Sequence, residues 1–271
     1  MRLEGRSVLL TGATGGIGNA IARELAMRGC ALTLTGRREA NLAHLVAELG
    51  PPARGFAADL TNLAEIRELL DHAGPVDILV ACAGIDIPQD LADTSDEVIE
   101  EAIRINLLAP AALARVALAP MRQRGEGHVV FIGSVAGLVA TPINSSVYTA
   151  SKWGLRGLGL ALRQELHGTG IGVSTVFPAG VRDAGIFART GITLPWYAGT
   201  SSPQQVARAV VRAVERDRPE VVVSAGGERL GAAISGVAPV LVGSIARVAG
   251  LGRIRQAVLE AQSRGDGPKA G

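Results

Sequence analysis

The amino-acid sequence predicts an α/β fold: a single doubly wound domain with a mainly parallel seven-stranded sheet flanked by helices on both faces. Three observations support this prediction. Short apolar, β-branched runs alternate with longer segments of helical periodicity, the pattern of parallel strands joined by crossover helices. A glycine-rich turn separates the first apolar run from the first helical segment. No repeat or linker interrupts the pattern, and 271 residues suit one large α/β domain.

The expected strands and helices alternate along the chain. Strands are expected at residues 7–10, 31–35, 55–58, 77–81, 128–133, 172–177 and 220–224. Helices are expected from the glycine-rich turn to residue 27, then to about residue 50, at about 62–73, at 96–124, and through Tyr148 to about residue 167. Pro110 is expected to bend or divide the helix at 96–124, because proline removes one backbone hydrogen-bond donor.

The C-terminal part differs in composition from the rest. Residues 230–246 contain no charge, and Arg247, Arg253 and Arg255 follow them. We expect residues 1–226 to form the main domain, and residues 227–271 to form an apolar helical extension with a polar tail. A buried helix or a helix at a dimer contact is the favoured interpretation of 230–255. A helix on a membrane surface is the alternative, given the basic flank.

Composition and charge exclude several classes of protein. A hydrophobic content of 48% supports a sizeable core, and a net charge of +2 is too small to indicate a nucleic-acid partner. Cys30 and Cys82, the only cysteines, lie in or beside apolar stretches, as expected for buried thiols in a reducing compartment. The four histidines are isolated, so we expect no metal site. The first residues lack the apolar run of a secretory signal, and we expect a cytoplasmic protein.

A glycine-rich turn at residues 11–18 follows the first strand and opens a helix. Small residues let the backbone approach a pyrophosphate, and the helix N-terminus supplies oriented N–H groups. A flexible loop is the alternative, but the position between strand and helix favours a dinucleotide site. The residues expected to bind the cofactor here are Gly12, Thr14, Gly15, Gly16, Ile17 and Gly18.

Two arginines follow the second strand, where the adenosine ribose of a dinucleotide normally lies. An acidic residue there would bind the ribose 2′-hydroxyl and repel a 2′-phosphate. This chain has Arg37 and Arg38, and guanidinium groups match a phosphate in geometry and charge. We therefore expect NADP(H), with Arg37 as the first contact and Arg38 as a helper. Two solvated arginines at the start of a helix are the alternative.

Tyr148 and Lys152 are the pair with the clearest chemical meaning. The chain has 27 cationic side chains but only two lysines, and it has two tyrosines. One of each lies four residues apart, on one face of a helix. A lysine there can lower the pKa of the phenol and stabilise the phenolate, giving a proton donor and acceptor near neutral pH. An ordinary surface pair on an amphipathic helix is the alternative.

With these elements in place, residues 5–224 resemble the short-chain dehydrogenase/reductase family, which has a Rossmann fold. Gly12, Gly16 and Gly18 match its cofactor glycines. The resemblance implies an adenine contact at Asp59 and Leu60, and a cofactor turn at Ala83 and Gly84. It also implies a catalytic set with a serine that orients the substrate, an acid/base tyrosine, a lysine that holds the nicotinamide ribose, and an asparagine that supports a water chain: Ser134, Tyr148, Lys152 and Asn106. Further cofactor contacts are implied at Pro178 and Val181.

Departures from the family pattern leave an alternative open. The family's Asn-Asn-Ala-Gly reads Ala81-Cys82-Ala83-Gly84 here, so side-chain hydrogen bonds below the cofactor are missing. Cys82 is interpreted as a buried structural thiol, with a redox-sensitive thiol as the alternative. Asp183 stands where the family usually has a threonine that orients the carboxamide. A catalytically weak NADP(H)-binding sensor or scaffold is therefore the alternative to an enzyme.

The expected activity is reduction of a ketone or aldehyde, or oxidation of the matching alcohol, by an NADP(H)-dependent oxidoreductase. Substrate choice is expected in a lid at about residues 184–202, where apolar and aromatic side chains suit an apolar carbonyl or alcohol. A lid that only buries its own side chains is the alternative. By family analogy we expect a homodimer or homotetramer built on the helices at 96–124 and 147–167. The lid side chains are Ile186, Phe187, Ile192, Leu194, Trp196 and Tyr197.

Overall fold

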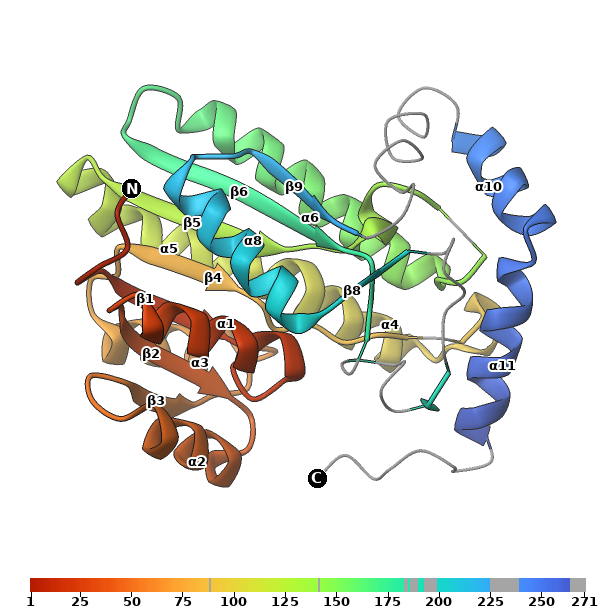
Figure 1. Ribbon diagram of the computed structural model, residues 1–271, viewed down its shortest axis with the longest axis horizontal. Helices are drawn as coiled ribbons and strands as arrows, with labels where there is room; N and C mark the ends of the chain where they lie inside the picture. The colour runs from red at the N-terminus through yellow and green to blue at the C-terminus, as the bar shows by residue number, and fades with distance from the viewer. Residues whose placement is uncertain are drawn as a thin grey trace.

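A seven-stranded parallel sheet forms the centre of the molecule in a computed structural model of the chain (Figure 1). The structure describes residues 1–87, 89–140, 142–182, 185, 190–192, 199–224 and 239–263. The strand order is β3-β2-β1-β4-β5-β6-β9, which confirms the doubly wound α/β prediction. The strands are β1 Ser7–Thr11, β2 Ala31–Gly36, β3 Arg54–Ala57, β4 Ile78–Ala81, β5 Gly127–Ile132, β6 Ile171–Pro178 and β9 Glu220–Val223.

Helices cover both faces of the sheet because its central strands are apolar on both sides. Val8 and Leu10 of β1 point into the core under α1, α2 and α8, whereas Leu9 points into the core under α3, α5 and α6. All three side chains are at most 1% exposed. Such continuous apolar runs are typical of parallel strands buried on both faces. The helices are α1 Gly16–Met27, α2 Glu39–Leu49, α3 Leu63–Ala73, α6 Ser146–Glu165 and α8 Pro203–Glu215, with α4 and α5 described next.

The long helical segment predicted at 96–124 is divided, but not at Pro110 itself. It consists of α4 Asp96–Ile103, a π-helical turn η2 Arg104–Leu108, and α5 Ala109–Arg124. Pro110 lies in the first turn of α5 and cannot donate a backbone hydrogen bond to the carbonyl of Asn106, one turn earlier. The regular ladder therefore breaks one turn before the proline, at Asn106. π turns of this kind are frequent at functional sites.

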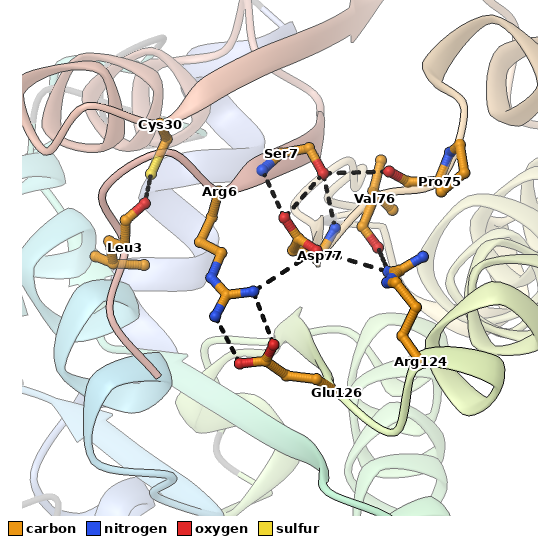
Figure 2. Close-up of polar contacts among 9 residues, drawn as sticks. All are labelled: Leu3, Arg6, Ser7, Cys30, Pro75, Val76, Asp77, Arg124 and Glu126. Atoms are coloured by element: carbon orange, nitrogen blue, oxygen red, sulfur yellow. Dashed lines mark hydrogen bonds and ion pairs between the residues drawn. The ribbon is translucent and has the colours of Figure 1, made fainter.

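A polar cluster ties together the amino ends of β1, β4 and β5 (Figure 2). Asp77 accepts hydrogen bonds from the backbone N–H of Ser7 at 2.9 Å and from its hydroxyl at 3.1 Å. Arg6 and Arg124 lie 3.9 and 3.6 Å from the same carboxylate. Arg6 also pairs with Glu126 at 2.6 Å. The cluster stabilises the edge of the sheet at the amino ends of the strands. The opposite edge, at the carboxyl ends, remains available for a binding site.

Shorter elements complete the described chain. Two 3₁₀ turns, η1 Leu91–Asp93 and η3 Val135–Gly137, lie in the loops after β4 and β5. A small parallel pair, β7 Gly180–Val181 with β8 Thr200–Ser201, follows β6 and was not predicted. The C-terminal extension contains α10 Pro239–Val248 and α11 Leu251–Ser263, at one end of the molecule (Figure 1). The division into parts at residue 226 stays a prediction.

One helical stretch among the described residues, Asp96–Arg124, is long and apolar enough to cross a membrane by length and composition. Half of its most apolar window is buried inside the fold, where α5 packs against α3 and the sheet. The stretch is apolar because it is a core helix that buries one side against the rest of the fold.

Candidate active site

The strand order reverses direction between β1 and β4, and the loops at the carboxyl ends of these strands lie against each other. Gly12 has φ +66°, and a Cβ atom there would lie 2.8 Å from the Cα of Ala83. The Thr11 hydroxyl accepts hydrogen bonds from the N–H groups of Cys82 and Ala83, at 3.0 and 3.1 Å. Glycine is therefore required at position 12 by both backbone and space. In open α/β sheets, ligands bind at such a reversal point.

The start of α1 presents bare backbone to this edge. Gly15 is the N-cap and forms no side-chain capping bond, and both Gly15 and Gly16 are exposed. Gly18 is buried, and a Cβ there would lie 2.1 Å from the carbonyl oxygen of Gly12. Gly18 thus lets the helix pack on the turn, while the exposed glycines leave room for an anion at the helix N-terminus. Thr14 and Ile17, the other predicted contacts in the turn, are partly buried.

The predicted ribose and adenine contacts lie at the ends of the neighbouring strands. Arg37 directly follows β2, is 69% exposed, and has a guanidinium nitrogen 3.9 Å from a carboxylate oxygen of Glu101. Arg38 is the N-cap residue of α2. Asp59 is exposed after β3, where one carboxylate oxygen accepts hydrogen bonds from Thr61, and the neighbouring Leu60 is buried. These positions border the same edge of the sheet as the glycine turn.

Asn106 holds the loop after β4 in place. Its side-chain oxygen accepts a hydrogen bond from the N–H of Ile85, and its nitrogen donates to the carbonyl of Ile85, both at 2.9 Å. The nitrogen also lies 3.2 Å from the hydroxyl of Ser151, which donates to the carbonyl of Tyr148. Asn106 is fully buried. It therefore connects the π turn, the Gly84 loop and the helix of the predicted catalytic pair.

Lys152 is buried between the ends of β4 and β5. It is 5% exposed, and its ammonium donates a hydrogen bond to the carbonyl of Ile132 at 3.2 Å. A Cβ at Gly84 would lie 3.4 Å from the Nζ of Lys152, so the predicted cofactor turn passes directly beside the ammonium. A Cβ at Gly137 would lie only 2.6 Å from the carbonyl oxygen of Lys152. Because glycine has no Cβ, the turn after Ser134 can pack closely against α6.

Ser134 and Tyr148 meet across the same site. Ser134 ends the segment after β5 and caps the 3₁₀ turn η3, where its hydroxyl accepts the N–H of Ala136 at 3.1 Å. Tyr148 lies in the first turn of α6, which Ser145 caps by accepting the N–H of Tyr148. A hydrogen-bonding interaction with the Ser134 side chain acts to lower the pKa of the phenol. The structure thus brings Ser134, Tyr148, Lys152 and Asn106 together.

The expected acidic phenol is wrong for this structure. Burial raises the pKa of Tyr148 above its ordinary value, and the charge of Asp86 raises it further. The ammonium of Lys152 lies 5.6 Å from the centroid of the Tyr148 ring, over its face. Burial also lowers the pKa of Lys152 to about 8, although Cys82 and Asp86 act to raise it. Loss of hydration outweighs the charge pairing that the four-residue spacing indicated. The phenol is therefore held in its protonated form.

Asp86 is the residue that sequence reasoning missed. Its carboxylate acts on the pKa of both Tyr148 and Lys152, because the loop fixed by Asn106 brings it to the site. The only signal in the sequence was its position two residues after Gly84. Cys82 is partly buried, and burial raises the pKa of its thiol to about 12. A protonated thiol supports the structural interpretation of Cys82 over the redox-sensitive one.

The remaining predicted contacts are only partly described. Pro178 is buried at the end of β6, and Val181 lies in β7, paired with Ser201 of β8. Asp183 lies outside the described residues. So does most of the predicted lid at 184–202, including Phe187, Trp196 and Tyr197. Within the described part of the chain, no group of three or more His, Cys, Asp or Glu is placed to hold a metal ion.

The arrangement fits a dinucleotide followed by a carbonyl group. Exposed glycines at the N-terminus of α1 leave room for a pyrophosphate, and Gly84 leaves space beside the ammonium of Lys152. A protonated phenol beside a serine hydroxyl can donate a proton to a bound oxygen. Tyr148 and Lys152 come from α6, Ser134 from the loop after β5 and Asn106 from the π turn, and all four meet at the carboxyl edge of one sheet.

Comparison with known proteins identifies a family and several similar proteins. Residues 6–191 match the sequence model described as short chain dehydrogenase. Ketoacyl reductase HetN from a Nostoc species is 39% identical over 229 residues, 82% of this chain and 79% of that protein. Dehydrogenase/reductase SDR family member 7B from Danio rerio is 31% identical over 245 residues, 83% of this chain and 79% of that protein. A solved short-chain dehydrogenase from Sphingobium yanoikuyae in complex with NADPH is similar with a TM-score of 0.75 and 30% identity, covering 86% of this chain and 94% of that one.

Proposed function

The chain belongs to the short-chain dehydrogenase/reductase family of oxidoreductases, which use nicotinamide cofactors, and from this premise we propose that it is an NADP(H)-dependent carbonyl reductase. Its substrate would be a ketone or aldehyde on an apolar small molecule, or the matching alcohol in the reverse direction. The observation that carries the proposal is the meeting of Ser134, Tyr148 and Lys152 beside Gly84, at the end of the sheet that also holds the glycine turn.

Each side chain has a role that its environment supports. The bound nicotinamide would supply the hydride to the carbonyl carbon. The Ser134 hydroxyl would donate a hydrogen bond to the carbonyl oxygen and hold it in place. Tyr148, kept protonated by burial, would give its proton to that oxygen as the C=O bond becomes an alcohol. Lys152, directed past Gly84, would hold the ribose hydroxyls of the cofactor and compensate the charge left on the phenolate.

Asn106 would act as a positioning residue. Its bonds to both polar backbone groups of Ile85 fix the Gly84 loop, and its bond to Ser151 links this loop to the carbonyl of Tyr148. A role in a water chain that returns the proton to Tyr148 stays a prediction.

The preference for NADP(H) is supported by charge at the end of β2. Arg37 and Arg38 stand there, and Arg37 is largely exposed toward solvent. A 2′-phosphate would gain a charge-assisted hydrogen bond to Arg37 that NADH lacks. The solved relative in complex with NADPH is compatible with this preference.

A β-oxoacyl group is the substrate class that we favour, because the similar Nostoc protein is named a ketoacyl reductase. The test is NADPH oxidation followed by absorbance, with β-oxoacyl thioesters of short, medium and long chain beside cyclic and aromatic ketones. Turnover that rises with acyl chain length supports the class. Turnover on aromatic or cyclic ketones alone contradicts the class but leaves carbonyl reduction standing.

The alternative of a catalytically weak NADP(H) sensor is favoured by the departures from the family pattern, namely Ala81 and Cys82 in place of two asparagines and Asp183 in place of a threonine. The same panel separates the two functions. Tight NADPH binding without turnover on any ketone would favour the sensor, whereas turnover that falls in Ser134→Ala favours the enzyme.

We also propose a homodimer or homotetramer in the cytoplasm. The outer face of α6 exposes Trp153 and Leu160, and Leu108 of the π turn is 50% exposed. Burial of these side chains against a second copy would remove apolar surface from water. The two cysteines are free in the structure, which is compatible with a reducing compartment.

A further inference from the structure

The C-terminal helix α10 has an inner face that fixes its orientation. Ala246 is 7% exposed, and Val242 packs against the cluster of Leu138, Val139 and Phe177. A Cβ at Gly243 would lie 3.4 Å from the carbonyl oxygen of Ala140. The helix is therefore packed against the rest of the protein on this side, and its opposite side faces away from it.

The opposite side of α10 is apolar and exposed. The exposed fractions are 78% for Val240, 55% for Leu241, 59% for Ile245 and 91% for Val248. These four belong to ten large hydrophobic residues that are exposed within the described chain, so the apolar surface is concentrated on this one short helix. Their spacing places them along one side of the helix.

A basic hollow adjoins this apolar face at the corner between α10 and α11. Its lining includes Arg247, Val248, Arg253 and Gln256. Arg247 donates a hydrogen bond to the hydroxyl of Ser244 at 3.1 Å, and neither Arg247 nor Arg253 forms an ion pair among the described residues. The sequence has no acidic residue between positions 239 and 259. An anion can therefore enter the hollow without meeting a competing carboxylate on these helices.

From these observations we propose that α10 docks on an anionic membrane surface. Its face of Val240, Leu241, Ile245 and Val248 would enter the boundary of the acyl chains, and Arg247 with Arg253 would bind a lipid phosphate in the hollow between α10 and α11. An apolar face with a basic flank is the pattern of helices that lie in a bilayer interface. A lipid surface is favoured over a second copy of this chain as the partner of this face. In contact with an identical face, the arginines at its edge, which form no ion pair within the described part of the chain, would meet the same positive charges.

Docking in this way would bring the candidate active site to the membrane. The extension borders the loop before α6 and the loop after β4. A Cβ at Gly252 would lie 3.8 Å from the Cβ of Pro142, and Arg255 pairs with Asp90 at 2.5 Å and donates to the carbonyl of Gln89 at 3.0 Å. An apolar substrate dissolved in the bilayer would then reach the site without crossing water. The docking itself does not depend on the proposed catalytic function.

The test uses the full chain and two kinds of vesicle, one of phosphatidylcholine alone and one of equal parts phosphatidylcholine and phosphatidylserine. Wild type is expected to float with the anionic vesicles and to stay behind with the neutral ones. Replacing Val240, Leu241 and Ile245 together by serine should weaken binding by at least about 100-fold, because each aliphatic side chain contributes to insertion. Met27→Ser, at a similarly exposed apolar residue of α1, is the matched control and should bind as wild type does.

The contribution of charge is tested separately. Arg247→Gln with Arg253→Gln should weaken binding about fivefold for each arginine, since each basic residue near an anionic surface contributes about that much. Arg208→Gln with Arg212→Gln, on exposed positions of α8, makes the same change in net charge and should have little effect. Wild type that stays off anionic vesicles overturns the proposal. So does a triple serine variant whose only change, by light scattering, is loss of self-association. Equal thermal midpoints for all variants confirm that folding is retained.

Discussion

Lys152 holds its ammonium 5.6 Å from the centroid of the Tyr148 ring while it donates a hydrogen bond to the carbonyl of Ile132 at 3.2 Å. The two side chains share a buried site, and burial acts on them in opposite directions. It raises the pKa of the phenol and lowers the pKa of the ammonium, so each is pushed toward its uncharged form. In the ligand-free site Tyr148 therefore keeps its proton, and Lys152, with a pKa of about 8, is still mainly charged at pH 7.

Lys152→Met is expected to stabilise the protein at neutral pH while it abolishes turnover. The pKa of Lys152 is about 8 in the folded state and near 10.5 when exposed, so at pH 7 the fold carries a buried charge. The unfolded chain binds the extra proton between these two pKa values, so wild-type stability rises as pH rises from about 8 to 10.5. The gain of the variant should be about 1–3 kcal/mol at pH 7 and should shrink above pH 8. Urea unfolding at several pH values measures it. A variant less stable than wild type at pH 7 would contradict this account of the site.

Arg37→Asp is expected to weaken NADPH binding by about 10- to 100-fold, since one charge-assisted contact to a phosphate contributes about 1.5–3 kcal/mol. NADH binding should change little, because it has no 2′-phosphate. Fluorescence titration of both cofactors measures the effect. Arg122→Asp, at an exposed position of α5, is the control for net charge. Equal losses for both cofactors would show that Arg37 does not select the phosphate.

His128 is expected to make the fold sensitive to acid. It is 2% exposed, its Nε2 lies 2.8 Å from the hydroxyl of Ser174, and that hydroxyl donates to the carbonyl of Arg218 at 2.6 Å. The Ser174 oxygen must therefore accept a hydrogen bond from the Nε2–H, which fits a neutral ring protonated at Nε2. Burial lowers the pKa of His128 to about 4 from the ordinary 6.5. The unfolded chain binds the proton first, so stability should fall as pH falls from 6.5 to 4, by up to about 3 kcal/mol.

The measurement is the free energy of unfolding in urea across this pH window. His128→Gln, which keeps a donor toward Ser174 but does not titrate, should have a flatter profile than wild type. Profiles of equal slope would assign the acid sensitivity to other groups, such as Asp217, whose pKa is lowered by its hydrogen bond to Arg163.

Asp77→Ala is expected to destabilise the fold without changing the chemistry. The carboxylate accepts two hydrogen bonds from Ser7 and lies near Arg6 and Arg124 (Figure 2). Its loss should cost about 1–3 kcal/mol, because a partly buried N–H loses its acceptor. Thermal unfolding and NADPH turnover below the new midpoint measure the two effects. A large fall in turnover at full folding would contradict the separation of the two sheet edges. Asp71→Ala, at an exposed position of α3, is the control.

The fold could be predicted from the sequence because its strands are short apolar runs and its helices are periodic. Observed strand ends differ from the expected ones by no more than one residue, as at Thr11 and Gly36. The small β7–β8 pair was missed because two-residue strands have no periodicity to detect. The break in this helix was predicted at Pro110. It lies at 104–108 instead, around Asn106, whose carbonyl loses its regular helical hydrogen-bond donor because Pro110 lacks an N–H.

The candidate site could be located but not fully characterised. The glycine turn and the Tyr148–Lys152 pair carry strong local patterns, and the structure brings them to one edge of the sheet. The direction of the Tyr148 pKa could not be predicted, because it depends on burial and on Asp86, and neither follows from the four-residue spacing. The exposed face of α10 depended equally on three-dimensional information, since a run without charges can lie inside or outside a fold.

The most direct test of the central claim is single-turnover NADPH oxidation by Tyr148→Phe, with the ketone that wild type reduces fastest. The phenyl ring keeps the packing but has no proton to donate, so the rate should fall by about 10²- to 10⁴-fold. NADPH affinity and the thermal midpoint should stay close to wild type. A Tyr148→Phe protein that oxidises NADPH at the wild-type rate would contradict the assignment of Tyr148 as the proton donor.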